Sequence, residues 1–105
     1  MKKFNVEDRS ITKNLKIIEW LKTELLSSLS LLFKVMLKNS EEKLLDLLAN
    51  IVMSAYLLAK RLGYSFKQVD RKLEKKLKKN IVDKHKIELW YNDLSKLLEH
   101  LKDRN

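Results

Sequence analysis

The chain contains no proline and only one glycine, Gly63, among its 105 residues. Strands and tight turns are usually delimited by these two residue types, so their near absence argues against a β-rich fold. Leucine and lysine, which are good helix formers, are abundant. A composition that is 45% apolar and 35% charged fits amphipathic helices and excludes a disordered chain. The sequence therefore predicts an all-α protein.

Apolar residues that recur every three to four positions predict four helices. We expect them at residues 12–37, 40–62, 66–79 and 84–101, with residues 1–10 as an N-terminal arm and residues 11–105 as a single helical domain. The short connections predict that neighbouring helices pack antiparallel in a four-helix bundle. The weak break near Asn80 leaves open one bent helix in place of the last two.

The expected helix ends carry recognisable signals. Gly63 suits the left-handed residue that ends a helix. Side chains suited to capping precede each expected helix start: Ser10 or Thr12, Asn39 with Glu42, Ser65 with Gln68, and Asp83.

The first two expected helices carry more apolar surface than one neighbour can cover. The main stripe of the first helix is interrupted only by a lysine, and a second stripe lies beside it. The main stripe consists of Ile11, Leu15, Ile18, Lys22, Leu25, Leu29, Leu32 and Met36, and the second of Ile17, Leu21, Leu31 and Val35. Exposed apolar surface of this extent usually marks association. We therefore expect a homo-oligomer, with a symmetric dimer as the simplest case.

The net charge of +9 is concentrated in one segment. Residues 60–86 contain eleven lysine or arginine residues against three acids. Such a surface could attract nucleic acid, a nucleotide phosphate or an acidic partner, but a solvated helix face is the simpler explanation and the one we prefer. Interleaved aromatic residues and a groove-reading helix are missing, so any nucleic-acid binding should be non-specific.

Several classes of site and location are excluded. The absence of cysteine rules out disulfides and thiolate metal sites, and His85 and His100 lack metal-ligand spacing. Residues 1–10 have no apolar run, so they do not resemble a signal peptide. The longest nearly uncharged stretch, residues 25–37, is too short for a transmembrane helix. We therefore expect a cytoplasmic protein with no membrane partner.

Polar residues spaced by four run along the first two expected helices. They are Glu19, Thr23 and Ser27 with Glu24 beside them, and Glu42, Asp46, Asn50 and Ser54. Carboxylates brought together by an antiparallel hairpin would suit Mg²⁺, which can hold a polyphosphate and activate water. The alternative is that the glutamates are solvated and that Asp46 and Asn50 form a hydrogen-bonded polar pair inside the helical core.

The stretch WLKTELLS at residues 20–27 and the segment 41–80, which includes LANIV and LLAKRLG, resemble the MazG family of all-α nucleoside triphosphate pyrophosphohydrolases. More narrowly, the chain resembles the short MazG-like proteins of Firmicutes. The resemblance implies a helical bundle that forms a dimer or a dimer of dimers. It also implies Mg²⁺ held by the acids of EExxE and ExxD motifs, and hydrolysis of a nucleoside triphosphate to the monophosphate and pyrophosphate.

The metal motifs of that family are degenerate in this chain. EExxE falls on residues 23–27, where only Glu24 is kept, and ExxD falls on residues 43–46, where only Asp46 is kept and Lys43 replaces an acid. Because charge count drives affinity for hard cations, Mg²⁺ binding should be weak at most. Glu19 and Glu42 are the nearest acids that could help Glu24 and Asp46.

The family's KxxxN motif, in contrast, is intact as Lys76 to Asn80, and the resemblance implies that these two residues contact a nucleotide phosphate. We therefore expect a MazG-like protein with weak or no Mg²⁺-dependent hydrolysis that still binds nucleotide. Two alternatives stay open: an active enzyme with a rearranged carboxylate site, and a non-enzymatic basic adaptor or non-specific nucleic-acid-binding protein. No catalytic residue is assigned.

Overall fold

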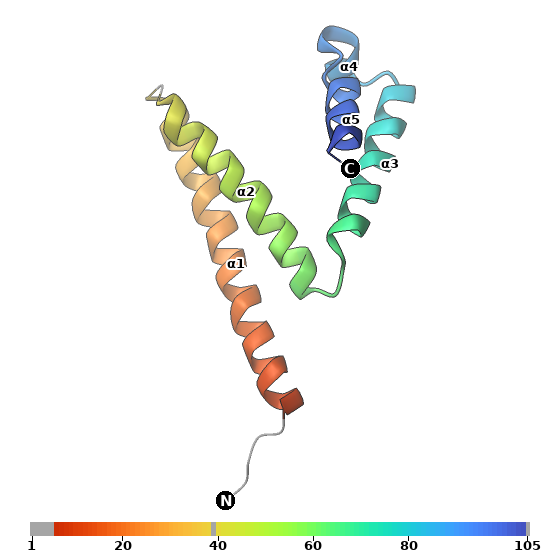
Figure 1. The fold of residues 1–105 in the computed structure, drawn as a ribbon. Coiled ribbons are helices and arrows are strands. Elements are labelled where there is room, and N and C mark those ends of the chain that lie inside the picture. Colours follow the sequence, from red (N-terminus) through yellow and green to blue (C-terminus); the bar gives the residue numbers. More distant parts are fainter. Residues whose placement is uncertain (1–5, 39, 105) are drawn as a thin grey trace, which may run out of the picture. The chain divides into compact units, whose positions relative to one another are not determined.

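The computed structural model describes residues 6–38 and 40–104 and contains five helices and no strand in those residues. The helices are α1 (Val6–Met36), α2 (Glu41–Arg61), α3 (Phe66–Val82), α4 (Lys86–Tyr91) and α5 (Asp93–Asp103) (Figure 1). The predicted all-α fold class is confirmed. The chain divides into two compact units, one built from α1 and α2 and the other from α3, α4 and α5.

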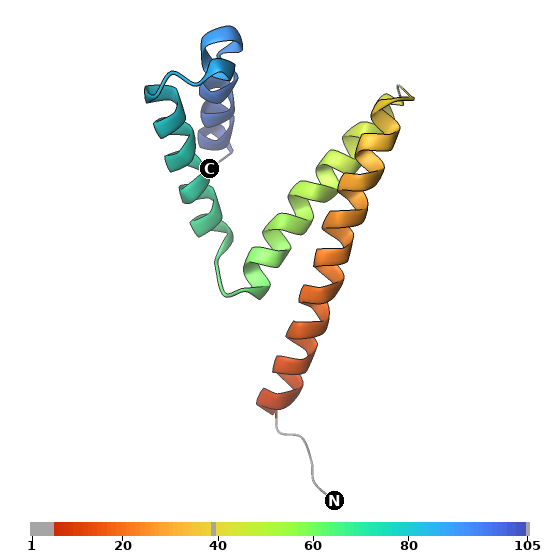
Figure 2. The same cartoon turned by 180° about the vertical axis from the view of Figure 1, so that it is seen from behind.

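The first unit is an antiparallel hairpin in which α1 and α2 lie side by side (Figures 1 and 2). The residues along their contact recur at alternating spacings of three and four, the pattern of a coiled-coil seam. Leu21 is only 1% exposed, and Leu32, Val35 and Leu47 form a buried cluster further along. The seam consists of Ile18, Leu21, Leu25, Ser28, Leu32 and Val35 of α1 and Leu44, Leu47, Ile51, Ser54 and Leu58 of α2.

This seam contains only part of the main apolar stripe of the first helix, namely Ile18, Leu25 and Leu32. Ile11, Leu15, Leu29 and Met36 of that stripe are all exposed, by 59%, 57%, 41% and 56%. The packed residues instead combine parts of both predicted stripes with Ser28, which is 4% exposed. A small side chain at this position lets the two helix backbones approach closely, and this favours the seam with fewer large side chains.

The ends of the hairpin helices differ from several expectations. α1 begins at Val6, six residues before the expected start, so Ser10 and Thr12 lie inside it and do not cap it. No glycine or proline interrupts residues 6–11, and therefore nothing stops the helix from extending. Asn39 lies outside the described residues. The N-cap of α2 is Ser40, which has extended backbone but no capping hydrogen bond from its side chain.

Gly63 ends α2 as predicted, with a φ of +101°. Its amide donates to the carbonyl of Lys60 over 3.1 Å, and the amide of Tyr64 donates to the carbonyl of Ala59 over 3.0 Å. These two bonds form a Schellman motif, which satisfies carbonyls left open at a helix end. Glycine takes the left-handed position without the steric cost that a Cβ would add.

In the second unit, α3 packs on α5, with Leu77 5% exposed and Leu101 3% exposed. The predicted capping box at the start of α3 is confirmed. The amide of Gln68 donates to the Ser65 hydroxyl over 3.1 Å, and the amide of Ser65 donates to the Gln68 side chain over 2.7 Å. These reciprocal bonds satisfy amides that the first helical turn leaves unpaired.

α3 continues to Val82, three residues beyond the predicted end, and closes with a second Schellman motif. The amide of Lys84 donates to Ile81, and the amide of His85 donates to Asn80, over 3.1 Å and 3.0 Å. Lys84 occupies the left-handed position with a φ of +56°. Lysine rarely adopts this conformation, so the residue type at position 84 does not identify the turn, although a helix boundary was predicted nearby.

The predicted helix over residues 84–101 is wrong as a single element, because it is broken into α4 and α5 at Asn92. Asn92 adopts a left-handed φ of +57°, which asparagine tolerates better than most residues. Asp83 is not the cap of this segment. The N-cap of α4 is His85, whose Nδ1 accepts a hydrogen bond from the amide of Ile87 over 3.2 Å.

The start of α5 is capped from the preceding helix. The Glu88 carboxylate accepts the amide of Ser95 over 3.0 Å and also accepts the Ser95 hydroxyl. The hydrogen bond from the Ser95 hydroxyl has the largest effect on the pKa of Glu88, followed by that from the Ser95 amide. Both lower this pKa below its usual value. Asn92 makes no capping bond with its own side chain, so Glu88 performs that task.

Candidate functional site

The polar centre of the hairpin is a hydrogen bond between Asn50 and Ser28. The Asn50 amide nitrogen donates to the Ser28 hydroxyl oxygen over 2.6 Å, in a part-buried position of the seam. The sequence placed Asn50 among the polar residues of the second helix but paired it with Asp46. The partner that it missed, Ser28, is a polar residue at seam spacing inside an apolar run, and that spacing was the available signal.

Glu24 and Asp46, the two acids kept from the metal motifs, lie on opposite sides of this contact. Glu24 precedes Ser28 by four residues on α1, and Asp46 precedes Asn50 by four residues on α2. Because the helices run antiparallel, the two acids are displaced in opposite directions along the axis. At 1.5 Å per residue they lie about 12 Å apart along the hairpin. Glu24 is half-buried and Asp46 is exposed.

The two possible helper acids do not close this gap. The Glu19 carboxylate accepts a hydrogen bond from the Lys22 ammonium over 2.8 Å, in an exposed ion pair on α1. Glu42 is exposed in the first turn of α2, next to Lys43. Within the described residues, Lys43 forms no ion pair with Glu24 or Asp46.

These side chains do not fit a Mg²⁺ ion held within one hairpin. Mg²⁺ requires oxygen ligands at about 2.1 Å in near-octahedral geometry, so its ligands must converge on one point. An axial separation of about 12 Å prevents Glu24 and Asp46 from converging. Among residues 6–38 and 40–104, no three His, Cys, Asp or Glu side chains are grouped so that they could hold a metal.

The residues of the KxxxN motif lie together on α3, in the second unit. Lys76 is exposed and Asn80 is half-buried one turn later, so that both side chains project from the same side of the helix. The backbone carbonyl of Asn80 is already used in the closing turn of α3. An ammonium and an amide at this spacing are suited to two oxygens of a phosphate group.

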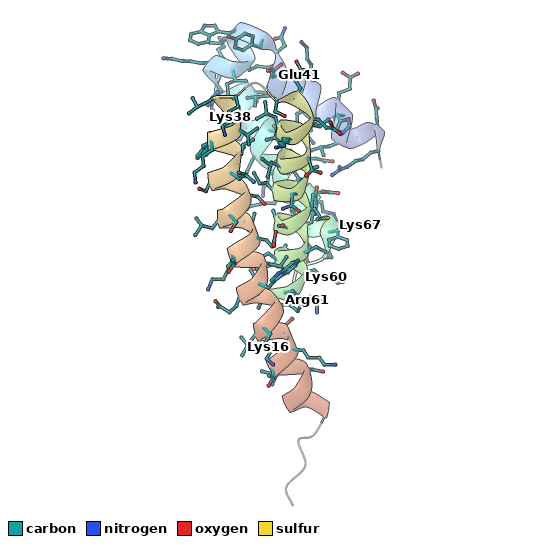
Figure 3. The ribbon with its side chains drawn as sticks, turned by 90° about the vertical axis from the view of Figure 1, so that its left-hand side faces the viewer. Lys16, Lys38, Glu41, Lys60, Arg61 and Lys67 are labelled. Carbon is teal, nitrogen blue, oxygen red and sulfur yellow. The ribbon has the colours of Figure 1, made fainter. Side chains whose placement is uncertain are left out.

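An open hollow of about 570 Å³ lies in the first unit near the end of α2. Asn14 connects the two helices there, because its amide donates to the carbonyl of Arg61 over 2.9 Å. Figure 3 shows Arg61 at this end of α2 and α1 continuing past it toward Lys16. With Lys13 and Arg61 in its lining, the hollow suits an anion better than a metal ion.

The fold and these side chains define an all-α protein with a coiled-coil-like hairpin, a neutral polar pair at its centre and a lysine-rich third helix. The MazG-like family model matches residues 11–94. The chain therefore belongs to the MazG-like family, and the resemblance seen in its sequence is confirmed. Membership implies the nucleotide pyrophosphohydrolase fold. No curated protein and no solved structure matches the chain.

No helix in the described part of the chain has both the length and the apolar character needed to span a bilayer.

Proposed function

We propose that this protein is a self-associating MazG-like scaffold with little or no Mg²⁺-dependent pyrophosphohydrolase activity, and that it retains nucleotide binding through Lys76 and Asn80. The observation that supports the loss of activity is the polar centre of the hairpin. A neutral Ser28–Asn50 pair occupies it, while Glu24 and Asp46 lie about 12 Å apart along the axis. With Lys43 in an acid position, too little negative charge converges to hold the ion.

Pyrophosphate release tests this part of the proposal. The full-length protein, supplied with a panel of nucleoside triphosphates and Mg²⁺, should release no more pyrophosphate than Asp46→Ala does. Turnover by the wild type that Asp46→Ala abolishes would contradict the proposal and would support a rearranged carboxylate site. Circular dichroism of both proteins verifies that Asp46→Ala, an exposed substitution, keeps the helices.

Nucleotide binding is measured separately by calorimetry without turnover. Lys76→Gln combined with Asn80→Ala should weaken binding of a nucleoside triphosphate at least tenfold. Lys102→Gln, an exposed lysine on α5, is the control and should leave the affinity unchanged. If Arg61→Gln weakens binding and the Lys76/Asn80 variant does not, the ligand occupies the hollow at the end of α2 and the assignment to α3 is wrong.

Self-association is supported by a broad apolar face of the hairpin, which the exposed ion pair of Glu19 and Lys22 interrupts on α1. Around each helix, the chain turns away from the seam in one rotational direction. Because the two helices are right-handed and antiparallel, residues just past the seam in that direction lie on the same side of the hairpin in both helices. Leu26 and Leu45 on this side are 72% and 71% exposed. The face comprises Ile11, Leu15, Leu26, Leu29, Phe33 and Met36 of α1 and Leu45, Leu48, Val52 and Leu62 of α2. Apolar surface of this extent usually marks an interface, and a second copy of the hairpin would cover it symmetrically.

Light scattering after size exclusion tests this interface. Leu29 and Leu48 lie near the middle of the face, so Leu29→Glu with Leu48→Glu should convert the oligomer to a monomer. The matched control is Ser30→Glu with Ala49→Glu, which adds the same charge at the neighbouring exposed positions on the outer side of each helix. A wild-type monomer at micromolar concentration, or equal dissociation of both variants, would contradict the proposal.

A further inference from the structure

Charge is strictly divided around α3. At about 100° per residue, its seven cations fall within one half of the helix circumference. All seven are exposed, and no acid shares that half. We call this surface the α3 cationic face; it consists of Lys67, Arg71, Lys72, Lys75, Lys76, Lys78 and Lys79.

The opposite half of α3 packs on α5 and contains both of its acids. Asp70 and Glu74 are half-buried on this side, around the buried Leu77. The guanidinium of Arg104, which lies just after α5, donates to the Asp70 carboxylate over 3.4 Å. Asp70 is therefore engaged within its own unit, and Glu74 forms no ion pair with a cation of α3 in the described residues.

No ion pair among the described residues involves any cation of the α3 cationic face. Lysines or arginines four residues apart stand next to one another on a helix, and like charges at this spacing repel. The face contains four such pairs, for example Arg71 with Lys75 and Lys75 with Lys79. A solvated surface of ordinary composition would intersperse acids at these spacings, so the face lacks its counter-charges.

The shape and chemistry of the face select among polyanions. Before Val82 at its end, the face has no apolar or aromatic side chain. A helix that lies in a membrane interface needs an apolar face for insertion, and the apolar half of α3 is packed on α5. Single-stranded nucleic acid is usually held by aromatic residues that stack on its bases, and none is present. A duplex backbone requires only exposed cations along a rigid element.

From this division of charge we propose that the α3 cationic face binds the phosphate backbone of double-stranded nucleic acid without sequence specificity. Arg71, Lys72, Lys75 and Lys79 fall within an arc of about 100° at the centre of the face and form the principal contacts. The face shares only Lys76, at its edge, with the proposed nucleotide site, and its four principal contacts lie outside that site.

Salt dependence tests this proposal quantitatively. Each neutralised phosphate contributes about −0.9 to the slope of log affinity against log salt, so four contacts give a slope of about −3.6. Affinity for a 20-base-pair DNA duplex, measured by fluorescence anisotropy, should fall about 150-fold between 50 and 200 mM salt. A duplex of RNA should behave alike, because the contacts are to phosphates.

The test variant is Arg71→Gln with Lys75→Gln and Lys79→Gln. Glutamine is a good helix former, so α3 should keep its helicity by circular dichroism. One central contact then remains, and the slope should shrink to about −0.9, or about a 3.5-fold loss over the same salt range. The control, Lys16→Gln with Lys34→Gln and Lys38→Gln on and just after α1, removes the same charge and should keep the steep slope. Figure 3 labels Lys16 and Lys38.

Three outcomes would overturn the proposal. The first is the absence of duplex binding by the wild-type protein at 50 mM salt. The second is an equal loss in the control variant, which would assign the attraction to net charge and not to α3. The third is capture of the protein by vesicles containing 30% phosphatidylserine when the duplex is not bound.

Discussion

Replacing the Ser28–Asn50 pair tests how the hairpin is held together. Asn50→Ala removes the donor from a serine that is only 4% exposed, and leaves its hydroxyl without that 2.6 Å hydrogen bond. A buried polar group that loses its partner costs about 1–3 kcal/mol. Because Asn50 is only half-buried, the expected loss lies in the lower half of that range, at about 1.5 kcal/mol.

A double-mutant cycle measures the energetic coupling between Ser28 and Asn50. It consists of the wild type, Ser28→Ala, Asn50→Ala and the double variant. The double variant should be destabilised by about 1 kcal/mol less than the sum of the single variants, because one hydrogen bond is lost in all three. A fourth protein, Ser28→Ala with Asn50→Leu, should be as stable as the wild type or more so, since it replaces both partners with apolar groups in an apolar seam.

Urea unfolding followed by circular dichroism at one fixed protomer concentration is the assay, because self-association makes apparent stability depend on concentration. Each kcal/mol should move the melting temperature by about 4–8 °C in a domain of this size. Single variants whose effects add to within 0.3 kcal/mol (about the scatter expected of independent sites) would refute the reasoning, because the pair would then contribute no coupling.

Three further predictions concern packing, a turn and an ionisation. Leu21→Ala should destabilise the protein by about 3 kcal/mol, because Leu21 is 1% exposed in the seam and the variant leaves a cavity; denaturant unfolding measures this, and a loss below 1 kcal/mol would contradict the packing. Lys84→Gly should increase the free energy of unfolding by about 0.5 kcal/mol and so raise the melting temperature, since glycine takes the left-handed φ of +56° without strain. The control is Asp83→Gly, one residue earlier, which should destabilise the protein. The folded pKa of Glu88 lies below its unfolded value of about 4.3, so its stabilising effect is complete above that pH and is lost as the pH falls through the folded pKa. Melting curves of wild type and Glu88→Gln should therefore differ at pH 7 and converge near pH 3, and a difference independent of pH would disprove this account.

The sequence predicted the parts of this fold that local chemistry decides. The first three helices, the capping box at Ser65 and the left-handed Gly63 all follow from side chains that act within a few residues of their own position. The break between the third and fourth helices was predicted near Asn80 and lies at residues 83–85, whereas the break at Asn92 was missed. The turns at Lys84 and Asn92 both use left-handed backbone that neither residue's own preference requires. Tertiary packing in the second unit overrides those preferences.

The seam of the hairpin shows a different limit. Periodicity identifies the apolar stripes of a helix but does not say which one meets the partner. Ile18, Leu25 and Leu32 of the main stripe are packed in the seam. Leu15 and Leu29 of the same stripe are exposed, and Ser28, which belongs to neither predicted stripe, is buried. Counting apolar residues does not predict this division, because the seam includes a buried serine that accepts a hydrogen bond from Asn50 of the partner helix.

For the candidate site, the motif comparison identified which acids the chain keeps, and the structure adds where they lie. Glu24 and Asp46 are the acids that the two motifs keep along the sequence, but the register of the hairpin decides whether they meet. That register follows from contacts such as Asn14 with Arg61 and Asn50 with Ser28, which no spacing along one helix reveals. The roles of Lys76 and Asn80 stay predictions.

The division of charge on α3 also determines how ionic strength acts on the protein itself. Each of the four like-charge pairs spaced by four costs about 0.2–0.5 kcal/mol at low salt, so together they oppose the helix by about 1–2 kcal/mol. Mobile ions screen this repulsion, and therefore added salt should stabilise α3 while it weakens attraction to a polyanion. Small ions and a duplex thus compete as counterions of the same seven side chains. Either one reduces the repulsion among these cations, so less repulsion remains for the other to reduce.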